Sequence, residues 1–219
     1  MDPYKHQFVT SLLAYAVQRE VKPEVLCNLS GIDLPLLKKK HHPEITEKTF
    51  HDLWHNAIRL TNDPLFGLHF GESLQLSALG VVGQIIQSSK TIGEALTYAC
   101  HAVGYITELV SMDAVRKRNK IIVCFYAQSH KRDSSVLSVK QFIDFFMVFT
   151  IHELDGLILK KLVPRRVLTQ QVAKEYLHEY ERVLRCKPKT SAGEFALEFD
   201  DTFWDEPITT ANYELQKIL

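Results

Sequence analysis

The segment from Ser134 to about Leu159 is the longest helix that the sequence predicts, and it constrains the fold most because it has almost no polar side. Side chains at helical spacing fall into two groups, Val139, Phe142, Phe146, Thr150 and Leu154 on one side and Phe145, Phe149 and His152 on another. A helix that is apolar nearly all round is normally a buried one. We therefore expect this helix to lie inside the core.

Two strands are predicted just before this helix, at 109–115 and 121–128, with the polar turn 116–120 between them. Along the second strand two sets of side chains alternate, Ile121, Val123 and Phe125 on one face and Ile122, Cys124 and Tyr126 on the other. Both sets are largely apolar, which is typical of a strand covered on both faces. We expect this strand near the centre of a sheet.

The remaining segments complete an α+β pattern. Apolar spacing and capping residues predict short helices before residue 75 and a helix from Thr91 to about Glu108 that starts with a capping box. After the long helix we expect a strand at 162–168, a helix at 170–184, strands at 186–190 and 195–199, and a last helix from Thr210. The sequence thus predicts one domain, 1–219, with a helical N-terminal lobe (1–75) followed by helices packed on a small, mainly antiparallel sheet (76–219).

Composition argues against a chain that binds DNA by itself. Its 26 basic and 26 acidic side chains give a formal net charge of zero, whereas phosphate contacts require a basic excess. The four cysteines are far apart and have apolar neighbours, which indicates reduced thiols. Because no signal segment and no apolar run of about 20 residues is present, we expect a soluble, cytoplasmic protein.

No catalytic or nucleotide-binding motif is present. The chain contains no phosphate-binding glycine loop, nucleophile elbow or metalloprotease helix. His51 and His55 share a helix face but have no third ligand, so surface histidines are the favoured interpretation and no metal is expected. A helix-turn-helix at 25–37 is disfavoured because its second helix would be very short and would contain Pro35.

The most suggestive polar group comprises Tyr98, His101 and Tyr105, which the spacing places on one face of the helix at 91–108. Aromatic side chains with polar tips can line a cavity and orient a small molecule. If the long helix faces them, Phe145, Phe149 and His152 would complete a ligand-binding pocket. The alternative is an ordinary core with tyrosine hydroxyls at its surface, and the sequence leaves both open.

Three glycine-containing motifs, in this order, resemble those of a known family: 63–72 (DPLFGLHFGE), 78–83 (ALGVVG) and 91–96 (TIGEAL). They are similar to the N-terminal, arabinose-binding-like domain of AraC-family transcription regulators, in the branch of ornithine and arginine utilisation regulators. The stretch 199–219 resembles the closing segment of that domain. The resemblance implies no catalytic residue, no cofactor and no invariant ligand-contact motif.

The resemblance also implies a function. The family joins this domain to roughly a hundred residues that hold two helix-turn-helix units, so we expect a homodimeric effector sensor whose DNA-binding half is missing from this chain. DNA would then be a partner only through that half, and no membrane partner is expected. A stand-alone small-molecule sensor is the alternative. A haem sensor with His101 or His152 as ligand, and a small hydrolase built on His152, Glu153 and Asp155, are further alternatives.

Overall fold

The computed structural model describes residues 3–39, 44–128 and 136–209. Its N-terminal third is helical, with α1 (Pro3–Gln18), α2 (Pro23–Leu29), α3 (Leu34–Lys38), α4 (Glu47–Thr61) and α5 (Phe66–Ser73). Next come the 3-10 turn η1 (Leu76–Leu79), α6 (Val81–Gln87) and α7 (Ile92–Ile106). The long helix α8 (Val136–Ile158) is followed by η2 (Lys174–Tyr176), α9 (Leu177–Leu184) and η3 (Asp201–Phe203). The helix expected from Thr210 and the expected start of the long helix at Ser134 lie outside the described residues.

The capping box predicted for α7 forms, with one difference. The Thr91 hydroxyl accepts a hydrogen bond from the Glu94 backbone N–H at 3.3 Å, as expected. The Glu94 carboxylate accepts from the backbone N–H of Lys90 at 2.6 Å, one residue earlier than in the standard arrangement. Both bonds satisfy amides at the helix start, so the local sequence determines where α7 begins.

Five strands form one sheet in the order β1-β2-β5-β3-β4. Their bounds are Val110–Lys117 for β1, Lys120–Ala127 for β2, Arg166–Thr169 for β3, Lys189–Thr190 for β4 and Phe195–Asp200 for β5. All neighbouring pairs are antiparallel except β3 and β4, which confirms the mainly antiparallel sheet and the α+β class.

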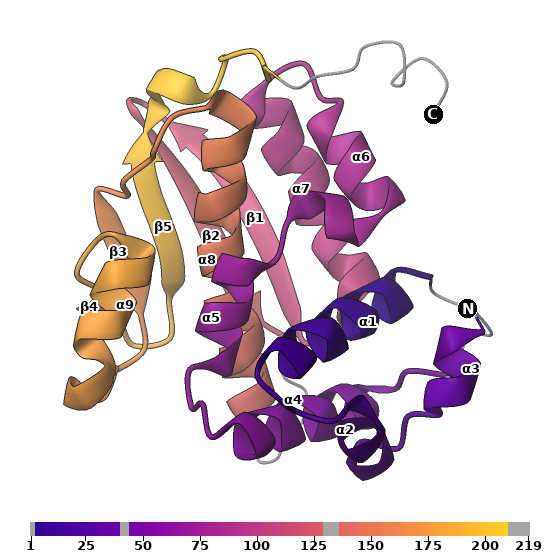
Figure 1. Cartoon of the computed structure of the whole chain (residues 1–219). Coiled ribbons are helices and arrows are strands. Elements are labelled where there is room, and N and C mark those ends of the chain that lie inside the picture. The colour runs from indigo at the N-terminus through magenta and orange to yellow at the C-terminus, as the bar shows by residue number, and fades with distance from the viewer. Residues whose placement is uncertain (1–2, 40–43, 129–135, 210–219) are drawn as a thin grey trace.

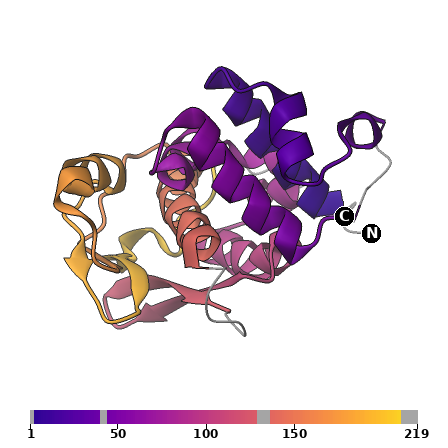
Figure 2. The ribbon, with the colours of Figure 1, turned by 90° about the horizontal axis from the view of Figure 1, so that it is seen from below.

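The expectation that β2 is covered on both faces is wrong. Ile121, Val123 and Phe125 are buried, but Ile122 and Cys124 on the opposite face are half-buried and Tyr126 is 49% exposed. Figure 2 shows the reason, because the helices lie on one side of the sheet and leave the other side open among the described residues. An antiparallel sheet can keep one face towards water, and apolar side chains there shield one another across strands.

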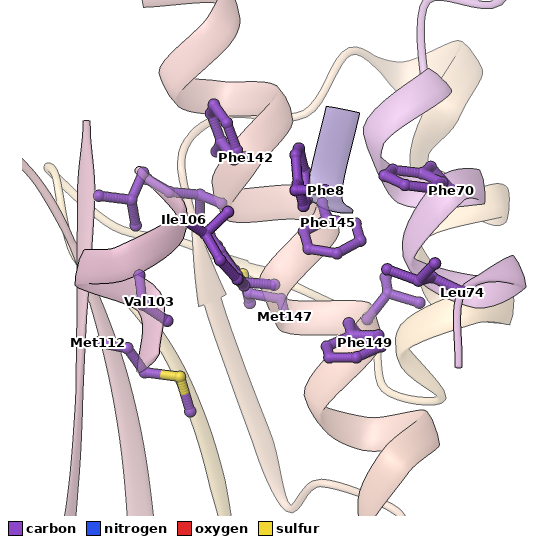
Figure 3. Packing of buried hydrophobic residues seen from close by; sticks show 14 of the residues in the cluster. Phe8, Phe70, Leu74, Val103, Ile106, Met112, Phe142, Phe145, Met147 and Phe149 are labelled. Atoms are coloured by element: carbon purple, nitrogen blue, oxygen red, sulfur yellow. The ribbon is translucent and has the colours of Figure 1, made fainter. Parts of the chain in front are cut away.

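The helix α8 lies between the sheet and the N-terminal helices, which gives the molecule three layers (Figures 1 and 2). Phe142 and Phe145 are completely buried, which confirms the expectation of a buried helix. On its outer side the Phe8 ring of α1 packs against them, with ring centroids 5.4 and 5.2 Å apart, and Phe70 of α5 lies 4.9 Å from Phe145 (Figure 3). This aromatic cluster joins the N-terminal helices to α8 in one continuous core.

The helix α5 lies unusually close to α8, and two glycines of the motif at 63–72 explain how. A Cβ atom on Gly67 would lie 2.3 Å from the backbone oxygen of Gln141, and one on Gly71 would lie 2.5 Å from that of Phe145. The Gly67 N–H also donates to Oε1 of Gln141 at 2.6 Å. Only residues without a side chain leave room for this backbone-to-backbone contact. The close contact is thus a tertiary reason for glycine at both positions of the motif.

Candidate effector-binding site

The three polar aromatic residues predicted to line a pocket share one face of α7, but that face points to solvent. Tyr98 is 39% exposed, Tyr105 is 54% exposed and His101 is also exposed. The Tyr105 ring packs against Tyr4 of α1, with centroids 5.5 Å apart, at the surface of the molecule. The helical spacing was therefore predicted correctly, whereas the side of α7 that faces the core was not.

The three residues of α8 that were expected to complete the pocket lie in three different surroundings. Phe145 is buried in the aromatic cluster described above. Phe149, whose ring stacks on that of Phe145 with centroids 5.3 Å apart, lines a cavity, and His152 is half-buried in a polar surface hollow. The structure therefore does not bring the six predicted residues together in one pocket.

An apolar cavity of about 50 Å³ lies where α7 meets α8. Its walls come from the inner face of α7, from α8, and from η1, α6 and β1: Leu76, Leu79, Ile86, Ala95, Leu96, Ala99, Ala102, Val103, Ile106, Met112, Phe146, Phe149, Thr150, Glu153, Leu154 and Leu157. Figure 3 shows Val103, Ile106 and Met112 on one side of this region and Phe149 on the other. One water needs about 10–15 Å³ of such space, so the cavity holds roughly four non-hydrogen atoms.

Glu153 is the only ionisable residue among those that line the cavity. Burial raises the pKa of its carboxyl to about 7, although the Leu76 backbone donates a hydrogen bond that opposes the shift. No charged side chain among the described residues contributes to this shift, so within that part of the chain the ionised carboxylate has no counter-charge close by. A cavity with apolar walls and one carboxyl at its edge is suited to a small molecule with one polar end.

Glu153 also borders a polar hollow on the surface, together with Glu72, His152 and several uncharged polar residues. Arg182 donates to both carboxylate oxygens of Glu72, at 2.8 and 2.7 Å, and these bonds lower the pKa of Glu72. Burial, with the charge of Arg185, lowers the pKa of His152. At neutral pH the hollow therefore has an ionised Glu72 that is already paired and a neutral imidazole.

Sequence reasoning missed this cavity, although two signals for it were present. Ala95, Ala99 and Ala102 recur at helical spacing on α7 and leave space beside a neighbouring helix. Glu153 follows Phe149 by four residues and Phe146 by seven, which places a charge on an otherwise apolar face of α8. The prediction rests instead on the polar aromatic residues of another face of α7, Tyr98, His101 and Tyr105.

The geometry gives no support to the haem and hydrolase alternatives. The cavity is far too small for a porphyrin in this conformation, and His101 is exposed. The Asp155 carboxylate accepts from the Leu162 N–H at 2.7 Å and pairs with Arg185 at 2.6 Å, so each of its oxygens already has a partner other than His152. Across the described ranges, no group of three or more His, Cys, Asp or Glu residues could hold a metal ion.

The last described segment of the chain is hydrogen-bonded to both helices of the cavity. The carbonyl of Trp204 accepts from the Gly93 N–H at 2.8 Å, and that of Glu206 accepts from Ile92 at 3.1 Å, both at the start of α7. The Thr209 N–H donates to the carbonyl of Leu157, a residue of α8 that lines the cavity, at 3.2 Å. A shift of α7 against α8 would therefore reach this segment directly.

Comparison with known proteins identifies the class of this domain. Residues 21–208 match the family described as the arabinose-binding domain of AraC transcription regulator, N-term. The chain is thus a sensing domain of a transcription regulator. More particularly, it belongs to this family of AraC-type N-terminal domains, which confirms the resemblance predicted from the three glycine motifs.

A solved structure with a similar fold is that of the transcriptional regulator CdpR from Pseudomonas aeruginosa, with a TM-score of 0.62 and 20% sequence identity. The alignment covers 81% of this chain and 56% of that chain, so this chain spans little more than half the length of CdpR. Comparison with curated protein sequences gave no match. Within the described ranges, no helix is both long and apolar enough to cross a membrane.

Proposed function

We propose that this chain is the effector-sensing and dimerising domain of a bacterial AraC-type transcription regulator, and that the effector binds in the cavity between α7 and α8. DNA binding itself belongs to a helix-turn-helix domain of the same regulator. The observation that carries the proposal is the apolar cavity with a single carboxyl at its edge, in a domain of a regulator family. The neutral formal charge of the chain agrees with a module that leaves DNA contact to another domain.

The route from effector to DNA runs through segment 203–209. This segment is bonded to the start of α7 and to the end of α8, and in the family the DNA-binding half follows it. An effector larger than the cavity separates the two helices, because the cavity holds only a few atoms. The effector thereby favours one arrangement of the domain over another, which is a population shift. A coupling of about 1–3 kcal/mol is enough to change operator occupancy.

Two further parts of the proposal concern assembly and chemistry. Regulators that read paired half-sites are usually two-fold symmetric, so we expect a homodimer in the cytoplasm, measurable by light scattering after gel filtration. We also expect no enzymatic turnover, because the cavity walls hold only one ionisable side chain, Glu153, and the described residues include no cluster that could hold a metal ion.

A thermal-shift screen with amino acids, sugars, fatty acids and amines tests the proposal. An effector at a hundred times its Kd stabilises the folded state by about 2.7 kcal/mol. We expect at least one class of ligand to raise the Tm of the wild type. The same ligand should not raise the Tm of Ala99→Leu, because the larger side chain fills the cavity. Tyr98→Ala, at an exposed position of α7, should respond like the wild type. Tight, sequence-selective duplex binding by this chain alone, or an equal response of Ala99→Leu, would contradict it.

A further inference from the structure

We propose that the effector is a small apolar amine, whose hydrocarbon part lies between α7 and α8 and whose ammonium group pairs with Glu153. This inference rests on the proposed function, because it takes the same cavity as the effector site. The amine inference requires no other change to the proposed function.

The shape of the cavity selects a short hydrocarbon group. The alanine side chains at 95, 99 and 102 of α7 leave a narrow space, and Phe146 and Phe149 of α8 form the opposite wall. Such walls offer no hydrogen bonds, so a sugar or another ligand with many hydroxyl groups would lose its hydration there without compensation. A linear hydrocarbon chain suits these walls, and one longer than about four atoms enters as α7 and α8 separate.

The charges at the cavity select the polar end of the ligand. Among the residues that line it there is no lysine, arginine or histidine, and Glu153 and Thr150 are the only side chains with polar atoms apart from the sulfur of Met112. In the adjoining hollow the charged group is Glu72, because His152 is neutral at pH 7. A carboxylate ligand would therefore meet the Glu153 carboxyl with no cationic side chain in the cavity walls, because the Arg182 guanidinium beside the hollow is already paired with Glu72. An ammonium group would meet a carboxylate that lacks a counter-charge among the described residues.

The state of Glu153 without ligand agrees with this choice. Burial raises the pKa of its carboxyl to about 7, since the charged form is partly removed from water. A cation beside a carboxylate favours the ionised form and offsets this cost. A neutral ligand of equal size would give the carboxylate no counter-charge, and it would exclude water that reaches the carboxylate when the cavity is empty. An amine therefore gains an interaction that neither an alcohol nor an acid of the same length can make.

The experiment compares three ligands of one length: n-hexylamine, hexan-1-ol and hexanoate, titrated into the purified chain by calorimetry. We expect the amine to bind most tightly. Its affinity should rise about fourfold from pH 6.5 to 8.0, because a carboxyl with a pKa near 7 goes from about a quarter to about nine-tenths ionised over that range. Glu72 and His152 have lowered pKa values, so they contribute little to this change. Hexanol should bind no more tightly at pH 8.0 than at pH 6.5, because a neutral ligand removes water from the ionised carboxylate without pairing it.

Matched variants assign the effect to Glu153. Glu153→Gln keeps the size of the side chain. We expect it to weaken hexylamine binding at pH 8.0 by about tenfold and to remove its pH dependence, while hexanol binds at least as tightly as to the wild type. His152→Gln, in the neighbouring hollow, should keep the wild-type profile. Ala99→Leu should abolish binding of every ligand. Should that variant fail to fold, Ala99→Val adds less volume at the same position.

The outcomes separate this inference from the proposed function. Suppose that hexanol or hexanoate binds the wild type more tightly than hexylamine does, and binds Glu153→Gln equally well. An amine effector is then excluded, and the cavity remains the effector site. If hexylamine binds the wild type with no pH dependence, or does not bind at all, the inference is overturned. If ligands bind Ala99→Leu as they bind the wild type, the cavity is not the site and both proposals are wrong.

Discussion

Replacement of Gly67 by alanine probes the contact that holds α5 against α8. The new Cβ atom would lie 2.3 Å from the backbone oxygen of Gln141 and 2.8 Å from its Oε1 atom. A change of side-chain rotamer cannot relieve this contact, because the nearest atom belongs to the backbone of α8. The two helices must separate by about 1 Å to reach ordinary van der Waals distance, roughly 3.5 Å. That movement also stretches the hydrogen bond from the Gly67 N–H to Gln141.

The expected loss of stability follows from three contributions. Overpacking of a close contact costs about 1–3 kcal/mol, and this case belongs at the upper end because backbone is involved. Loss of the hydrogen bond adds about 1 kcal/mol. The higher helix propensity of alanine returns about 1 kcal/mol. The net loss is about 3 kcal/mol, which lowers the Tm of a chain of this size by roughly 6–12 °C.

Denaturant and thermal unfolding followed by circular dichroism measure this change, with Gly104→Ala as the matched control. A Cβ atom on Gly104, an exposed residue in α7, meets nothing within 4 Å. That variant should therefore be more stable than the wild type by up to about 1 kcal/mol, through helix propensity alone. If Gly67→Ala proves as stable as Gly104→Ala, the close contact between α5 and α8 does not exist as described.

Two more predictions concern polar contacts on α5 and α9. The His69 ring bonds the carboxylates of Asp63, at 2.7 Å, and Glu179, at 3.0 Å, and these bonds raise its pKa although burial opposes the shift. The stabilisation from protonated His69 is complete below about pH 6.5 and is lost as the pH rises through the raised pKa. The Tm of the wild type should therefore exceed that of His69→Gln by less at pH 8.5 than at pH 6.5. A difference that grows with pH would refute the ion pairs. The Tyr180 hydroxyl donates to the buried Asp144 carboxylate at 2.6 Å, and the other oxygen of Asp144 has no partner among the described atoms. Tyr180→Phe should therefore lower the free energy of unfolding by about 1–3 kcal/mol, and an unchanged denaturation midpoint would show that the carboxylate is satisfied otherwise.

Local patterns were sufficient to predict most of the secondary structure. The start of α7 depends on Thr91 and Glu94, which satisfy backbone amides within one turn, and the burial of α8 follows from an apolar surface that extends around the helix. These features depend on residues close together in the sequence. The same holds for the β1–β2 hairpin, where the turn and both strands are contiguous.

The exposed face of β2 and the orientation of α7 could not be predicted in this way. Each depends on which neighbour covers the element, and that neighbour is remote in the sequence. On β2 both faces are apolar, so the pattern cannot show that helices cover only one of them. On α7 two faces compete, one with Tyr98 and Tyr105 and one with small apolar side chains.

The sequence by itself determined the family, the α+β class and the position of the buried helix, because each of these is encoded in contiguous motifs or in periodicity along one segment. Tertiary structure alone decided where a ligand can bind. The alanine face of α7 is turned inwards, where α7 packs on β1 and α6 and leaves a space beside α8, and the bulkier tyrosines are left towards water. The cavity, with the half-buried carboxyl of Glu153 at its edge, exists only because α7 has this orientation.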